Sequence, residues 1–405
     1  MLKRLMVNTG VQILGKAITV STTLLTTGIL TRKLGIDAYG NFLLITSILV
    51  FFDSLADFGT TTIGVREASK IEGSKSEDNR IKLWSSVAML RIVMAIISFG
   101  LATIFVFVWP DLKEIRVEAI LAWAMILFTS VAGSLGIVWQ TKLKLEIKVV
   151  VEVMFPLVFL IGLWLNRGDI TLKWVFSMYL VARIISLVWA WWLGKGNLNI
   201  KTIDKEIIRN ILKMSWPMGV YMLVFSTYDR AVDSLMIKNF LGSSEVAWYG
   251  LAYKIYGVLI QPAYFLVSGL FPLLSAKKSQ KEAFKLGFWG LLFGGIMMVI
   301  GTRFFASWMI ITLAGEEYLA SVEVLRILAF SLFFSYLGHL FGFTLVSRDG
   351  QKEILGLGLI ALVFNLVGNI IAIPRFGVSG AAVVTVMTEA LAMMLMLVRL
   401  GKRKN

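Results

Sequence analysis

The 405-residue sequence contains no cysteine, so disulfide bonds and thiolate chemistry are excluded. It contains a single histidine, His339, so a histidine-based metal site or catalytic relay within one chain is not expected. We interpret His339 as a packing residue of an apolar helix. A nucleotide-binding loop of the G-x-x-x-x-G-K-[ST] type is also absent. We propose no catalytic residue, metal site or cofactor for this sequence, and we do not expect the protein to be an enzyme.

Charged residues are few, at 16%, while 58% of the residues are hydrophobic and the mean hydropathy is +0.80. This composition is typical of an integral membrane protein, since a transmembrane helix needs about 20 mostly apolar residues. The sequence predicts an all-α fold with twelve such helices. Their approximate ranges are 9–31, 41–65, 83–109, 118–140, 149–166, 172–194, 213–240, 246–275, 286–312, 319–346, 354–373 and 377–398.

The formal net charge of +15 is a signal of membrane orientation. If both termini are cytoplasmic, 25 of the 40 Lys and Arg residues lie in cytoplasmic segments and nine lie in outer ones. Such a bias sets the orientation of membrane helices. We therefore expect a multi-pass protein of the cytoplasmic (inner) cell membrane with both termini inside. Nucleic-acid binding is not expected, because topology accounts for the excess of basic residues.

The chain is predicted to form two six-helix lobes, residues 1–195 and 213–405, joined by a polar, basic cytoplasmic linker, 196–212. The two halves resemble each other weakly. Leu-Gly pairs ending at Gly35 and Gly242 follow the first and seventh spans. Each half starts on the cytoplasmic side, so the repeats would be parallel and related by an axis along the membrane normal.

The stretch from 213 to 242 can cross a bilayer, yet it contains Asp229, Arg230 and Asp233. Charged side chains at membrane depth cost a few kcal/mol and usually face protein or a water-filled cavity. Asp229 and Asp233 share a helix face, and Arg230 is close enough in sequence to pair with Asp233. Two interpretations stay open: a neutralised cluster that fixes helix packing, or a helix that lines a polar path.

Other charged residues also fall within predicted spans. Asp53 and Asp57 lie four residues apart and give the second span one acidic face, and Glu389 lies in the last span. Lys16 and Lys254 lie too deep to reach water easily, so they either neutralise the aspartates or attract an anionic ligand. Arg91 and Arg183 have no acidic partner at helical spacing, and pairing between helices stays open.

Four stretches together resemble the Wzx-type polysaccharide flippases of the multidrug/oligosaccharidyl-lipid/polysaccharide exporter superfamily. They are LTRKLGIDAYGNFLLI (30–45), DSLADFGTTTIGVREASK (53–70), STYDRAVDSLMIKNFLGSSEVAWYGLAYKI (226–255) and PRFGVSGAAVVTVMTEA (374–390). The resemblance implies a fold like that of MATE transporters, with helices 1, 2, 7 and 8 lining a central cavity. It also implies alternating access that moves a lipid-diphosphate-linked oligosaccharide to the outer leaflet.

The resemblance further implies that basic residues meet the diphosphate. The candidates here are Lys16, Arg91, Arg230 and Lys254. The acidic candidates for ion coupling or gating are Asp53, Asp57, Asp229, Asp233 and Glu389. The expected partners are the lipid-linked glycan, membrane lipids and a coupling ion, and a monomer is favoured. Coupling to an ion gradient or to the membrane potential follows because no nucleotide-binding loop is present.

Two other functions stay open. A multidrug or small-molecule exporter of the same superfamily would share the fold. A membrane glycosyltransferase or glycan polymerase would need acidic or basic residues in sizeable outer loops, and the outer loops predicted here are short.

Overall fold

The structure is a computed structural model that describes residues 2–71, 76–166, 168–227, 232–276, 279–348 and 350–402. All regular elements in these ranges are helices, which confirms the all-α fold. The contacts within the chain divide it into two units, Met1–Gly35 with Ile45–Ser226 (unit 1) and Ile36–Leu44 with Thr227–Asn405 (unit 2).

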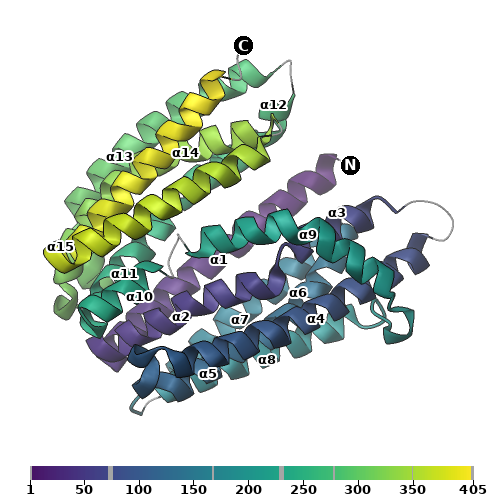
Figure 1. Ribbon diagram of the computed structural model, residues 1–405, viewed down its shortest axis with the longest axis horizontal. Helices are drawn as coiled ribbons and strands as arrows, with labels where there is room; N and C mark the ends of the chain where they lie inside the picture. Colours follow the sequence, from purple (N-terminus) through teal and green to yellow (C-terminus); the bar gives the residue numbers. More distant parts are fainter. Residues whose placement is uncertain are drawn as a thin grey trace. The chain divides into compact units, whose positions relative to one another are not determined.

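Unit 1 contains the helices of the first half of the chain and the start of the second half. They are α1 (Leu2–Leu34), most of α2 (Ile36–Asp57), α3 (Thr60–Ser69), α4 (Ser76–Val108), α5 (Arg116–Trp123), α6 (Met125–Thr141), α7 (Leu145–Leu165), α8 (Leu172–Gly194) and α9 (Lys205–Ser226), with the short 3₁₀ helices η1 (Pro110–Ile115) and η2 (Ile200–Thr202). Within this unit α7 packs against α1 and α8, and α6 packs against α4 (Figure 1).

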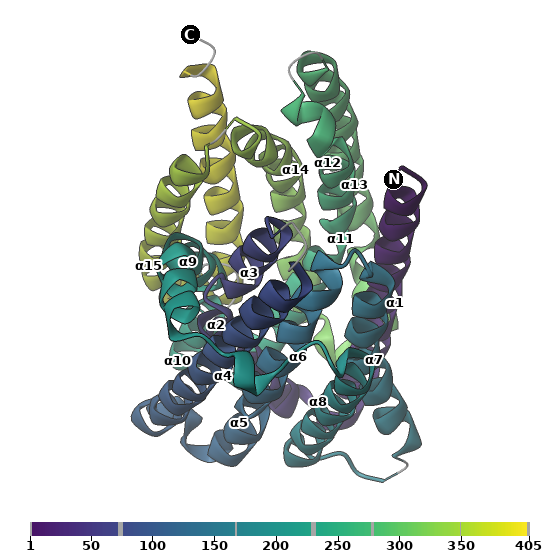
Figure 2. The same ribbon diagram turned by 90° about the vertical axis from the view of Figure 1, so that its right-hand side faces the viewer.

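Unit 2 contains the remaining helices. They are α10 (Val232–Phe240), α11 (Ser243–Leu259), α12 (Gln261–Ser275), α13 (Gln280–Ala314), the 3₁₀ helix η4 (Glu316–Tyr318), α14 (Ala320–Val346) and α15 (Gln351–Lys402). Helix α14 packs between α13 and α15. Figure 2 shows α15 as two limbs that fold back on each other. The bend lies at Gly377, whose φ of 60° is unfavourable for other residues, and Gly368 on one limb packs against Val384 on the other.

The predicted spans agree with these helices. Ten segments of the described residues are long and apolar enough to cross a membrane. One of them, Lys352–Lys402, is the bent α15 and therefore holds the eleventh and twelfth predicted spans. The seventh predicted span runs through α9 and α10, and it includes residues 228–231, which lie outside the described residues.

The boundary between the units differs from the predicted linker. It lies at Ser226, because the first part of the seventh predicted span packs on unit 1. Phe58 packs edge-on against Trp216 with ring centroids 5.5 Å apart, and a Cβ at Gly219 would overlap the Phe58 ring. The division into two six-helix lobes therefore stays a prediction from the sequence.

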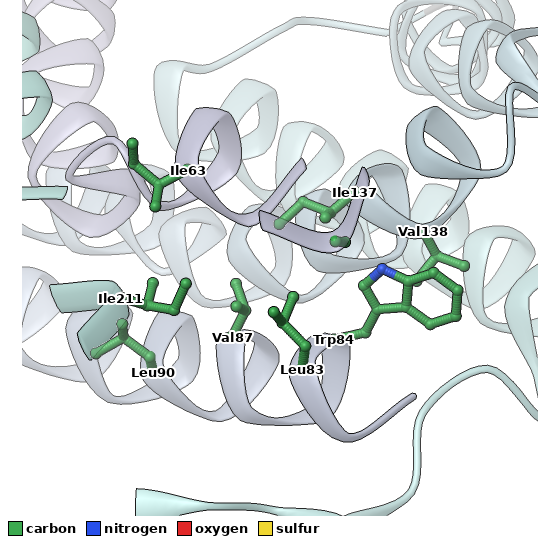
Figure 3. Packing of buried hydrophobic residues seen from close by; sticks show 9 residues of the cluster. Ile63, Leu83, Trp84, Val87, Leu90, Ile137, Val138 and Ile211 are labelled. Atoms are coloured by element: carbon green, nitrogen blue, oxygen red, sulfur yellow. The ribbon is translucent and has the colours of Figure 1, made fainter. Parts of the chain in front are cut away.

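The predicted linker is bound to unit 1. Lys82 forms an ion pair of 2.6 Å with Asp204, and the hydroxyls of Ser85 and Ser86 accept the backbone N–H groups of Asn199 and Asp204. Apolar residues of α3, α4, α6 and α9 meet beneath it (Figure 3). The buried members of this cluster are Ile63, Ala68, Leu83, Trp84, Val87, Leu90, Ile137, Val138 and Ile211.

Candidate functional site

The second predicted span is broken within unit 1. Helix α2 ends at Asp57, and the next two residues, Phe58 and Gly59, both adopt left-handed backbone angles, with φ of 41° and 76°. Gly59 accommodates this conformation and also lies against Met218 and Gly219 of α9, where a Cβ would clash. The hydroxyl of Thr60 donates to the carbonyl of Asp57 at 2.5 Å as α3 begins.

An ion pair crosses this break. The guanidinium of Arg91, which is 4% exposed, pairs with the Asp57 carboxylate. It also donates to the hydroxyls of Thr60 and Thr61, at 3.1 and 2.6 Å, and to the carbonyl of Ser130 at 3.2 Å. Helix α6 leaves room for it because Gly133 has no side chain, and a Cβ there would lie 2.5 Å from Nη2 of Arg91.

A second basic side chain of unit 1, Arg183, is also engaged. Its guanidinium lies over the Phe155 ring, 4.0 Å from the centroid, a distance that permits a cation–π contact. The charges that act on Asp53 are those of Arg183, Arg91 and Asp57. Among the described residues, these two arginines and two aspartates form one ion pair, that of Arg91 with Asp57. This arrangement favours a structural role for Arg91, and its predicted contact with substrate stays a prediction.

Lys16 lies on α1 of unit 1 and its side chain is exposed. Among the residues that the structure describes, no carboxylate forms an ion pair with it and no hydrogen bond of its ammonium is seen. The structure therefore does not bring Lys16 to Asp53 or Asp57 within unit 1. Lys254, on α11 of unit 2, is half-buried, with its ammonium 5.8 Å from the centroid of the Phe42 ring.

Asp233 belongs to a buried hydrogen-bonded cluster in unit 2. Its side chain is 2% exposed and accepts from the Tyr249 hydroxyl at 2.6 Å and from Nδ2 of Asn369 at 2.7 Å. Asn369 also donates to Asn365 Oδ1 at 3.1 Å, and the Tyr249 hydroxyl lies 2.9 Å from that of Thr385. Within the described part of the chain, the buried Oδ1 of Asn369 has no hydrogen-bond partner. A buried acceptor of this kind beside a carboxylate is suited to a cation.

Glu389 lies elsewhere in unit 2. Its carboxyl group accepts a hydrogen bond of 2.8 Å from Ser335, whose hydroxyl lies 2.7 Å from that of Tyr256. His339 lies one turn further along α14, and its Nδ1 is 2.6 Å from the carbonyl oxygen of Ser335. This contact agrees with the interpretation of His339 as a satisfied residue of an apolar helix.

The structure brings together some candidates and not others. Asp57 joins Arg91, and Asp53 is influenced by Arg183, whereas Asp233 and Glu389 belong to two different clusters. Asp229 and Arg230 lie outside the described residues. The sequence analysis missed the partners of Asp233, namely Tyr249, Asn365, Asn369 and Thr385. Asn365 and Asn369 could have been found, because two amides four residues apart in an apolar span share one helix face.

A comparison with known families shows the family of the chain. The family described as "Polysaccharide biosynthesis protein" matches residues 5–278, which is more than half of the sequence. The chain belongs to the polysaccharide biosynthesis protein family.

Two curated relatives match part of the chain. An uncharacterized membrane protein of Methanocaldococcus jannaschii is 28% identical over 194 residues, 45% of this chain and 37% of the relative. The protein named "Probable low-salt glycan biosynthesis flippase Agl15" of Haloferax volcanii is 26% identical over 222 residues, 50% of this chain and 44% of the relative. Each match thus covers less than half of the relative's length.

Solved structures share the fold of this polysaccharide biosynthesis protein. The lipid II flippase MurJ, in an inward closed conformation, has a TM-score of 0.79 with 14% identity, covering 98% of this chain and 87% of MurJ. An inward-facing multidrug resistance MATE family transporter of the MOP superfamily has a TM-score of 0.76 with 14% identity, covering 94% of both chains. At such identities these similarities establish the fold, which is the predicted MATE-like fold.

Proposed function

We propose that this protein is a flippase that moves a polyprenyl-diphosphate-linked oligosaccharide from the inner to the outer leaflet by alternating access. Membership of the polysaccharide biosynthesis family supports the class of substrate, as does the relative named as a glycan biosynthesis flippase. The observation that carries the proposal is the contrast between the intramembrane cations of unit 1. Arg91 and Arg183 are engaged by neighbouring groups, whereas Lys16 is exposed.

An exposed ammonium within a membrane span needs a reason, because an ionised side chain is costly at membrane depth. A lipid diphosphate is an anion that enters and leaves, so a permanent carboxylate partner for Lys16 would compete with it. We place Lys16, together with Lys254 and Arg230, at the diphosphate. The glycan would cross about 30 Å of hydrocarbon in a polar lumen while the lipid tail stays in the bilayer.

We place the coupling ion at Asp233. The carboxylate of Asp233 and the amides of Asn365 and Asn369 gather oxygen ligands of the kind that a hard cation takes, and Oδ1 of Asn369 has no partner among the described residues. Such a cation would satisfy this buried oxygen and offset the buried negative charge. Downhill movement of one charge across 100 mV supplies about 2.3 kcal/mol for the conformational cycle.

The proposed location is the cytoplasmic membrane, with both termini inside. The measurement is labelling of single cysteines by an impermeant reagent in intact cells, which is clean because the native chain has no cysteine. Cysteine at position 113 should react from outside and cysteine at position 201 should not. Reaction at 201 with protection at 113 would reverse the orientation.

The test of the transport activity is transfer of a fluorescent lipid-linked oligosaccharide across the bilayer of proteoliposomes. An organic-cation efflux assay in parallel addresses the alternative, a multidrug or small-molecule exporter of the same fold. Ion-dependent transfer of the glycolipid without efflux supports the flippase. Efflux of organic cations without glycolipid transfer would contradict the flippase and support the exporter.

A further inference from the structure

A hydroxyl chain in unit 2 ends on the carboxyl group of Glu389. The Ser335 hydroxyl donates to Oε2 of Glu389 at 2.8 Å and lies 2.7 Å from the Tyr256 hydroxyl. Ser335 and Tyr256 are 2% and 4% exposed, and Glu389 is half-buried. Three helices, α14, α11 and α15, thus hold one carboxyl group and two hydroxyls in a line within the apolar part of the chain.

This chain can satisfy Glu389 in both protonation states. A serine hydroxyl and a phenol each donate one hydrogen bond and can accept others. When Glu389 is ionised, Ser335 donates to the carboxylate and accepts from Tyr256. When Glu389 carries a proton, the carboxyl group donates to Ser335, whose own hydrogen turns toward Tyr256. The oxygen atoms of Glu389, Ser335 and Tyr256 thus stay joined by hydrogen bonds in both states, and only the Tyr256 hydrogen, at the far end of the hydroxyl chain, loses Ser335 as its acceptor when Glu389 is protonated.

The cluster around Asp233 lacks this property. Oδ1 of Asp233 accepts from Nδ2 of Asn369, and an amide nitrogen cannot become an acceptor. The hydrogen bond has one direction only, and it favours an ionised Asp233. The Asp233 cluster therefore suits a cation, whereas the hydroxyl chain on Glu389 suits a proton.

The helices packed against α15 supply the other titratable and charged groups of this region. They are His339 and Tyr336 of α14, Asp233 of α10, and Tyr249, Tyr253, Lys254 and Tyr256 of α11. His339 lies one helical turn after Ser335 on α14. Because its Nδ1 lies 2.6 Å from the Ser335 carbonyl oxygen, that nitrogen carries the hydrogen and Nε2 is the basic atom. A second titratable group thus adjoins Ser335, on its backbone side.

The geometry points to Glu389 as a proton-binding site that is separate from the Asp233 cluster, with Ser335 as its hydrogen-bond partner and Tyr256 as the partner of Ser335. Glu389 follows Thr385 by one turn of α15, and the Thr385 hydroxyl is bonded to Tyr249, the donor to Asp233. Protonation of Glu389 therefore occurs one helical turn from the coupling cluster. The consequence for transport rests on the proposed function: flipping depends on pH through Glu389 and on the coupling cation through Asp233.

The first test detects the proton directly and does not measure transport. Infrared difference spectra of the purified protein, recorded during a pH titration, report the C=O stretch of protonated carboxyl groups. Glu389→Gln should lose one such band, and Ser335→Ala should keep it at a shifted frequency, because the carboxyl group remains and one hydrogen bond is lost. Glu152→Gln is the matched control and should keep the band, since Glu152 is a water-accessible partner of Lys148. An unchanged band in both Glu389→Gln and Ser335→Ala would overturn the inference.

The second test is transfer of the fluorescent glycolipid at several pH values and cation concentrations. Glu389→Gln should lose the pH dependence and keep the cation dependence, whereas Asp233→Asn should keep the pH dependence and need a higher cation concentration for half-maximal transfer. Wild-type pH dependence in Glu389→Gln would contradict the inference. If the infrared band is lost in Glu389→Gln but the wild-type protein transfers no glycolipid, the proposed function fails and the proton site stands.

Discussion

Arg91 and Asp57 form a buried ion pair that spans the break between α2 and α3, although they lie 34 residues apart in sequence. A buried ion pair offsets its own desolvation only while both partners are present. Removing one partner usually costs about 3–5 kcal/mol, because an uncompensated charge is left in a low-dielectric interior. The pair therefore stabilises a helix break at which Phe58, a residue other than glycine, adopts unfavourable left-handed backbone angles.

Arg91→Ala should lower the free energy of unfolding by about 3–5 kcal/mol. The matched control is Lys148→Ala, which removes a water-accessible pair of 3.7 Å with Glu152 and should cost about 0–1 kcal/mol. Denaturant unfolding of the purified variants measures both. Equal stability of Arg91→Ala and the control would show that the pair does not hold the break.

Gly133→Ala should also destabilise unit 1, by about 1–3 kcal/mol, because the new methyl group would overlap the Arg91 guanidinium. Gly136→Ala is the control on the same helix, since its nearest neighbour would be Cε of Lys148 at 4.0 Å. Alanine favours helix over glycine by about 0.8–1 kcal/mol, so Gly136→Ala should be neutral or stabilising. Denaturant unfolding measures the stability of both variants. A Gly133→Ala variant more stable than the wild type would refute the packing described for Arg91.

The sequence predicted the helical spans well, because a run of about 20 apolar residues is a local property. The bend at Gly377 also falls at the first residue of the predicted span 377–398, just after the span 354–373. The pairing of Arg91 with Asp57 could not be predicted, since it depends on which helices become neighbours. The break at Phe58 gives no local signal either, because a lone glycine in an apolar span is common. The boundary between the units depends on packing of α9 and is not visible in composition.

Asp204 should make the attachment of the linker sensitive to acid. The hydrogen bond from Lys82, and those from the backbone of Glu206 and Ile207, hold the pKa of Asp204 below its usual value of 3.8. A carboxyl group whose pKa is lower in the folded state stabilises the fold above its usual pKa. That contribution is lost as the pH falls through the folded-state pKa.

The measurement is the mobility of a spin label at position 200, since Ile200 is 86% exposed and tolerates the label. The label should become more mobile as the pH falls below 3.8, and Asp204→Asn should remove this dependence on pH. Acid-induced mobility that persists in Asp204→Asn would assign the effect to another group.

Asp233→Asn should weaken the binding of the coupling cation. Two unit charges 4 Å apart attract by about 4 kcal/mol at an effective dielectric constant of 20, and tenfold in affinity is about 1.4 kcal/mol. Loss of this whole attraction corresponds to about a thousandfold, so the cation concentration for half-maximal transport should rise by at least about tenfold. Tyr249→Phe keeps the charge and removes one hydrogen bond, so its effect should be smaller. Unchanged cation dependence in Asp233→Asn would remove Asp233 from coupling.

We propose that positive charge at Lys16 and Lys254 binds a lipid diphosphate. Transfer of a fluorescent lipid-linked oligosaccharide in proteoliposomes tests it with charge-keeping and charge-removing variants. Lysine binds phosphate as a point charge, and a guanidinium can replace it. Lys→Arg at either position should keep partial transfer, and Lys→Gln should abolish it. Full transfer by the Lys16→Gln, Lys254→Gln double variant would contradict the diphosphate site.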